Sequence, residues 1–97
     1  MEGLPEKISI LGLVYDVREV EVVDKSNPCY GEINYQDQVI KIDKGLTSER
    51  KGMVLMHEVL HGVLEAIGQN ELNNDENAVQ SIASALYHVL SSQTISF

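Results

Sequence analysis

Two histidines and a glutamate stand close together in the segment His57-Glu58-Val59-Leu60-His61. On an α-helix, which turns by ~100° per residue, the two histidines lie one turn apart on the same face. Both imidazoles can then reach one zinc ion at the ~2.0 to 2.1 Å that zinc prefers, while Glu58 is rotated towards a zinc-bound water. Zinc lowers the pKa of such a water to ~7, which makes Glu58 a candidate general base. The segment therefore predicts a zinc hydrolase with His57 and His61 as ligands and Glu58 as the catalytic residue.

A helix from about Ser48 to Ile67 is expected to carry this motif, with a hydroxyl N-cap at its start and Gly68 just past its end. Its few polar side chains share one narrow arc, and the remaining face is apolar. A chance pair of solvated histidines is the alternative interpretation, but two unpartnered histidines in the middle of an apolar helix would be costly to bury. Glu65 lies near the same arc and is a candidate hydrogen-bond acceptor for a ligand imidazole.

The third ligand is expected from a second helix, because a catalytic zinc site takes three protein ligands and keeps one position open. The extended metzincin pattern, with a further glycine and histidine, is absent. Glu76 is the better candidate, since it borders the apolar stripe of the second helix. Asp75, as an N-cap or first-turn residue, and Glu71, as a loop acid, compete with it, and His88 lies near the far end. Glu76 has an alternative role as a first-turn acid that complements the helix dipole.

The second helix should begin near Asn74 or Asp75 and run to about Ser91, after a polar connection over residues 69–74. To bring Glu76 to the histidines, it must cross the first helix at an angle. Tyr87 lies too far along the helix to act beside Glu76 and is expected to be a core or rim residue. The tail 92–97 is expected to be frayed or loosely docked. The predicted buried face, at helical spacing, consists of Val79, Ile82, Ala83, Leu86 and Leu90.

The first half of the chain has the pattern of β-strands. Residues 8–23 are rich in β-branched and aliphatic side chains and predict one or two strands, followed by a break over residues 24–28. The segments Tyr30–Tyr35 and Gln38–Ile42 flank a short turn and predict a hairpin. Tyr30 and Tyr35 are candidates for lining a substrate groove, although strand packing is the commoner role. Strands followed by helices indicate an α+β domain.

Composition limits the classes of protein to which the chain can belong. With 97 residues, 43% of them hydrophobic and 23% charged, a single globular domain is expected over the whole chain. The net charge of -8, with only seven basic residues, argues against nucleic acid as a partner. No apolar run approaches the ~20 residues of a membrane span, no secretory signal is recognisable, and Cys29 is the single cysteine. A cytoplasmic protein is therefore expected, and a host and a viral cytoplasm would look the same here, with no membrane partner; the oligomeric state is not predicted.

The motif and its surroundings resemble a known family. The run from Leu55 to His61, followed by the segment Asp75–Leu86, is similar to small phage and mobile-element zinc metallopeptidases related to the ImmA/IrrE group, and the likeness extends over about residues 30–90. It implies a minimal zincin-like domain of α+β class, with a small antiparallel or mixed sheet packed on the active-site helix and a second C-terminal helix. It also implies gluzincin-type zinc ligands at His57, His61 and Glu76, with Glu58 as general base. The family's commoner Asn-x-Phe-Ala segment is replaced here by Gln80-Ser81-Ile82-Ala83.

Two functions of different classes follow. The first is a zinc metallopeptidase that cleaves a peptide or protein substrate with a water activated by Glu58. The alternative is a non-catalytic zinc-containing protein that binds or inhibits a host or regulatory partner, which the acidity of so small a chain leaves open. A non-peptide hydrolase that uses the same water is a weaker third interpretation.

Overall fold

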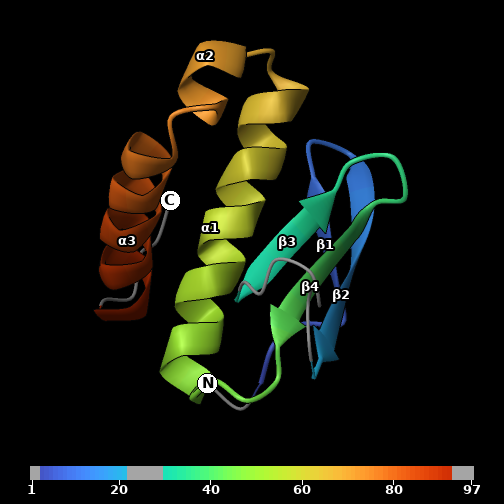
Figure 1. The fold of residues 1–97 in the computed structure, drawn as a ribbon, viewed down its shortest axis with the longest axis vertical. Helices are drawn as coiled ribbons and strands as arrows, with labels where there is room; N and C mark the ends of the chain where they lie inside the picture. The colour runs from blue at the N-terminus through green and yellow to red at the C-terminus, as the bar shows by residue number, and fades with distance from the viewer. Residues whose placement is uncertain (1–2, 22–29, 93–97) are drawn as a thin grey trace.

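A computed structural model describes residues 3–21 and 30–92. Figure 1 shows three layers, a sheet, the long helix α1 in the middle and helix α3 on its far side. The strand order β1-β2-β4-β3 joins a parallel β2–β4 pair to two antiparallel pairs, so the sheet is mixed. The expected α+β class with a small sheet is therefore confirmed. The elements are β1 (Lys7–Ile10), β2 (Leu13–Val20), β3 (Gly31–Asn34), β4 (Val39–Asp43), α1 (Ser48–Ala66), α2 (Asn70–Asn73) and α3 (Glu76–Ser92).

Both antiparallel pairs are hairpins. Leu11 and Gly12 join β1 to β2 with positive φ angles of 50° and 87°, as a type I′ turn requires. The first apolar stretch therefore forms two strands, and its last residues, Val22 and Val23, lie outside the described residues together with the predicted break. The predicted hairpin of β3 and β4 is confirmed. The Asn34 side chain accepts a hydrogen bond of 2.9 Å from the Asp37 amide and closes the connection, so Tyr35 belongs to the turn rather than to the strand.

The core lies between α1 and one face of the sheet. It gathers alternate residues of the strands and one helix residue, in accordance with the two-residue period of a strand. The other face of the sheet is charged, with Asp16 within 3.7 Å of Lys7 and 3.5 Å of Arg18. Gly62 lets α1 approach closely, because a Cβ atom there would lie 2.8 Å from the Ile10 Cδ1 atom. The buried cluster consists of Ile10, Tyr15, Ile40, Ile42 and Leu55.

Helix α1 begins and ends as its sequence predicts. The Thr47 hydroxyl accepts a 3.3 Å hydrogen bond from the Arg50 amide and caps the start. At the end, Gly68 has a φ of 75°, and its amide and the next one bond the Glu65 and Leu64 carbonyls in a Schellman motif. The helix therefore holds its motif in the middle of a rigid element.

Helix α3 is also found where expected, but its buried face is rotated. Val79 and Ala83 are buried as predicted, whereas Ile82, Leu86 and Leu90 are 39%, 40% and 52% exposed, so their predicted burial is wrong. The physical reason is that, within the described residues, α3 packs on α1 and the short α2 but on none of the strands, so that only a narrow stripe is covered. That stripe continues to Tyr87, whose ring lies against Gly52 of α1, which confirms Tyr87 as a packing residue.

The connection between the two long helices is more ordered than its polar composition predicts. Asn70–Asn73 forms one helical turn, α2, which Figure 1 shows above the end of α1. The chain then returns so that α3 begins beside α1. Among the described residues, no helix is both long and apolar enough to cross a membrane. Cys29 and the tail residues 93–97 lie outside the described residues.

Candidate metal centre

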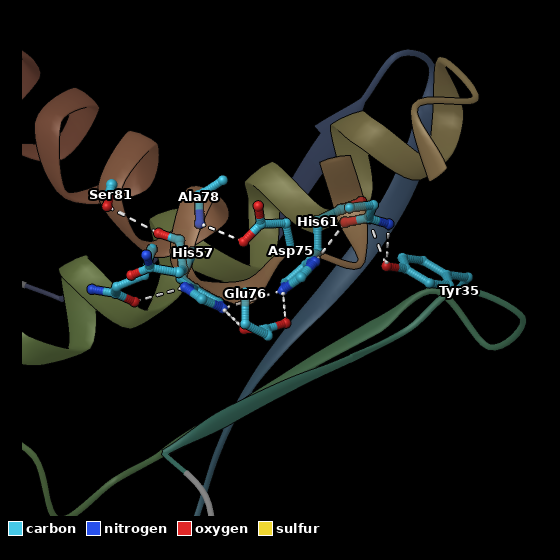
Figure 2. A network of polar contacts seen from close by, with 10 residues as sticks. Tyr35, His57, His61, Asp75, Glu76, Ala78 and Ser81 are labelled. Atoms are coloured by element: carbon cyan, nitrogen blue, oxygen red, sulfur yellow. Dashed lines mark hydrogen bonds and ion pairs between the residues drawn. The ribbon is translucent and has the colours of Figure 1, made fainter. Parts of the chain in front are cut away.

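Three side chains from two helices meet at one point. His57 and His61 lie one turn apart on α1, and Glu76 opens α3. The two Nε2 atoms lie 3.2 Å apart, and the Glu76 carboxylate lies 3.1 Å from His57 Nε2 and 2.8 Å from His61 Nε2. The imidazoles are 15% and 11% exposed, whereas the Glu76 side chain is 68% exposed at the rim. Figure 2 shows this convergence, in which both rings point at the carboxylate.

Both imidazoles are held from behind by side-chain amides. His57 Nδ1 lies 2.8 Å from Gln80 Oε1, and His61 Nδ1 lies 2.5 Å from Asn73 Oδ1. A carbonyl oxygen only accepts hydrogen bonds, so each Nδ1 carries the proton in these contacts. In the neutral imidazole the Nε2 atom then presents a lone pair.

These donors fit a zinc ion. Two Nε2 lone pairs and a carboxylate repel one another unless a proton or a metal cation lies between them. Neighbouring ligand atoms of tetrahedral zinc, with bonds of ~2.0 to 2.1 Å, lie ~3.3 Å apart, and the separations here are 2.8 to 3.2 Å. In the described part of the chain, these residues form the one group of at least three potential ligands. Three protein donors leave one tetrahedral position for a water or a substrate.

The competing acids lie elsewhere. Asp75 caps α3, because its carboxylate accepts a 3.1 Å hydrogen bond from the Ala78 amide, a contact drawn in Figure 2. Glu71 is exposed in α2, and the His88 ring is exposed and packs edge-on against Tyr87. The structure thus brings together His57, His61 and Glu76 and leaves out the other candidates.

The expected hydrogen-bond partner of the histidines is wrong. Glu65 is exposed, and the Nδ1 atoms bond to Gln80 and Asn73 instead. The role of Gln80 could have been predicted from the sequence, since it lies one turn after Glu76 and so shares its face of α3. The role of Asn73 could not have been predicted, because it belongs to the polar connection between the long helices, whose path does not follow from the sequence.

A groove of about 630 Å³ lies beside the three donors. Strand β3 forms one side and α1 the other, and Tyr30 and Tyr35 both line it, as candidates for a substrate groove should. The Arg50 guanidinium lies 5.0 Å from the centre of the Tyr30 ring. Gly31 lets β3 lie close to α1 at this groove, because a Cβ atom there would lie 2.5 Å from a Val54 methyl carbon and 3.3 Å from the Glu58 carboxylate.

Glu58 lines the same groove but is nearly buried, with 7% exposure. Desolvation by burial raises its pKa to about 7; His61 opposes this shift, and Glu76 and Glu32 add to it. A carboxyl group whose pKa lies near neutrality can take up and release a proton at working pH. The second residue of the motif therefore has the burial and proton affinity of a general base.

The raised pKa of Glu58 predicts how the stability of the metal-free protein depends on pH. Between the ordinary glutamate value of 4.5 and about 7, the folded state keeps a proton that the unfolded state has lost. Stability therefore falls as pH rises through this window and changes no further above it. Replacing Glu58 by Gln removes this pH-dependent loss of stability, so the variant should be more stable than wild type by up to about 3 kcal/mol at pH 8.

Urea denaturation in the presence of a chelator measures this difference. At pH 4, where Glu58 is protonated in both states, wild type and Glu58→Gln should unfold at the same urea concentration. A stability difference that is independent of pH would contradict the assignment of the raised pKa to Glu58.

Comparison with known proteins adds no relative to this picture. No protein-family model matches the chain, and neither a curated protein nor a solved structure matches it significantly. A function for this protein is therefore inferred from its residues and their geometry.

Proposed function

We propose that this protein is a zinc metallopeptidase with a zincin-like domain of the gluzincin type, related to the ImmA/IrrE group. The observation that carries the proposal is the convergence of His57, His61 and Glu76 beside a groove. The buried Glu58, next to the first histidine and facing the same groove, supports catalysis rather than a purely structural metal site.

The residues divide the chemistry among them. A zinc ion bound by the three donors supplies a Lewis acid that polarises a carbonyl group and makes water more acidic. Glu58 accepts the proton of the attacking water and delivers it to the leaving amine. Gln80 and Asn73 keep the Nε2 lone pairs directed at the metal.

Strand β3 gives the site a means of holding an extended peptide. It is an edge strand, with β4 as its one neighbour in the described sheet. The Asp43 amide donates to the Tyr30 carbonyl, which makes Tyr30 and Asp43 a hydrogen-bonded pair of the antiparallel ladder. The pattern alternates along an antiparallel ladder, so Gly31 and Ile33 direct their backbone groups to the free edge. A substrate can therefore add as a further strand beside the histidines.

Substituting proline for Ile33 tests this binding mode. Proline removes the outward amide without breaking a bond to β4, and edge strands tolerate it. We expect kcat/KM for a peptide substrate to fall about tenfold, as the loss of one hydrogen bond of ~1 to 1.5 kcal/mol implies, with zinc content unchanged.

The matched control is Ile33→Ala, which loses the same apolar side chain and keeps the amide. It should retain most of the activity of wild type when both are measured below their unfolding temperatures. Equal activity of the proline variant and this control would count against strand addition at β3.

The decisive experiment for the function combines metal analysis with substrate detection. Protein purified with zinc should contain about one zinc ion per chain. Incubated with a bacterial lysate, it should generate new peptide termini, detected by mass spectrometry, that are absent with Glu58→Gln. Zinc binding without new termini in any lysate or peptide library would reject the peptidase and keep the metal site.

A non-catalytic binding or inhibitory protein is the second candidate. The observation that favours it is the exposed apolar stripe on α3, formed by Ile82, Leu86, Val89 and Leu90. In that case Glu58→Gln should preserve the biological effect of the protein, whereas Leu86→Glu should abolish it. The reverse pattern is expected of a peptidase.

A further inference from the structure

Three hydrogen bonds form a closed ring that begins and ends at His61. The Tyr35 hydroxyl donates to the His61 backbone carbonyl over 3.5 Å. Asn73 Nδ2 donates to the Tyr35 hydroxyl oxygen over 3.1 Å, and Asn73 Oδ1 lies 2.5 Å from His61 Nδ1. Figure 2 shows Tyr35 approaching His61 from the side opposite to Glu76. The ring joins the β3–β4 turn, α1 and α2.

The direction of each bond follows from the one before it. A tyrosine hydroxyl has a single proton, and once this proton is directed at the His61 carbonyl, the oxygen can only accept. It then accepts from the amide nitrogen of Asn73, so the amide must turn its oxygen towards the imidazole. That oxygen in turn requires the proton of His61 to be on Nδ1, which leaves the lone pair on Nε2, where the other two donors meet.

We propose that Tyr35 is a positioning residue of the metal centre: through Asn73 it selects the imidazole tautomer in which His61 can bind a metal. This inference rests on the proposed metal site. His57 differs, because its Nδ1 atom is paired with Gln80, and within the described residues neither Tyr35 nor Asn73 has a hydrogen bond to it. The three hydrogen bonds therefore orient His61 alone. Tyr35, in the β3–β4 turn, also lines the groove.

Without the Tyr35 hydroxyl, the amide of Asn73 is free to rotate by half a turn. Its nitrogen then donates to His61 Nδ1, the ring proton moves to Nε2, and the lone pair needed by the metal is lost. Substitutions of residues that hold ligand histidines typically cost ~10 to 100-fold in metal affinity. We expect Tyr35→Phe to weaken zinc binding about tenfold.

The rescue variant is Asn73→Asp. A carboxylate only accepts hydrogen bonds, so it keeps the proton of His61 on Nδ1 whether or not Tyr35 is present. Zinc affinity, measured by competition with a chromophoric chelator, should therefore fall about tenfold on Tyr35→Phe in the Asn73 background and by less than twofold in the Asn73→Asp background. Tyr30→Phe is the matched control, because it removes a hydroxyl from the same groove outside the ring, and should leave the affinity unchanged.

A second measurement does not require zinc. In metal-free protein at alkaline pH, ¹⁵N chemical shifts of the imidazole should show His61 protonated on Nδ1 in wild type and on Nε2 in Tyr35→Phe. An unchanged tautomer, or an equal loss of affinity in both Asn73 backgrounds, would overturn the proposal. If wild type binds no zinc, the proposed function fails, while the tautomer experiment still decides whether Tyr35 directs His61.

Discussion

Replacing Glu58 by Gln should abolish turnover while zinc stays bound. The amide has nearly the same shape as the carboxylate but cannot take up a proton, and general acid–base catalysis contributes ~10² to 10⁴-fold to a rate. We therefore expect kcat/KM to fall by about that factor. Glu58 lies outside the group of three donors, so zinc content and affinity should change little. Steady-state kinetics on a peptide substrate, with zinc measured in the same samples, checks both expectations.

The stability of the Glu58→Gln variant should exclude misfolding as the cause of its inactivity. Because burial raises the pKa of Glu58, the metal-free glutamine variant should be at least as stable as metal-free wild type at neutral pH. Inactivity combined with higher stability can only be a chemical defect. The control is Glu65→Gln, which changes an exposed acid on the same helix and should keep full activity. An active Glu58→Gln enzyme would remove this residue from the mechanism.

Local patterns predicted most of the fold and three of the four candidate site residues. The caps of α1, the two-residue period of the strands and the hairpin of β3 and β4 are each determined by neighbouring residues. His57 and His61 are brought together by the repeat of a single helix. Glu58 follows the first of them directly in the sequence. No long-range contact has to be known for any of these predictions.

The remaining parts depend on how α3 docks. Its hydrophobic spacing predicted burial of Ile82 and Leu86, but α1 and α2 cover only the stripe that contains Val79 and Ala83. Placing Glu76 beside the two histidines needed the crossing of two helices, and placing the amide of Asn73 needed the path of α2. Such contacts arise between elements, so periodicity along one element cannot reveal them.

Removing the metal should produce the second large effect, a loss of stability. The proposed ligands come from α1 and α3, so a bound ion would hold the outer helix against the central one. A ligand present at a thousand times its dissociation constant stabilises the folded state by about 4 kcal/mol. For a domain of this size, each kcal/mol corresponds to ~4 to 8 °C in Tm. Chelation should therefore lower Tm by roughly 15 to 30 °C, and added zinc should restore it.

Glu76→Gln separates this metal site from a simple ion pair between the glutamate and the histidines. If the carboxylate only pairs with protonated imidazoles, the substitution lowers Tm by the same small amount with and without zinc, since an exposed pair contributes at most ~1 kcal/mol. If it is a zinc ligand, wild type and variant should differ by only a few degrees in chelator and by many more degrees in zinc. Glu71→Gln, which alters an exposed acid of α2 outside the cluster, should follow wild type in both conditions. A Tm difference between wild type and Glu76→Gln that is equal with and without zinc would therefore reject the metal site, because loss of a metal ligand must cost more stability when the metal is present.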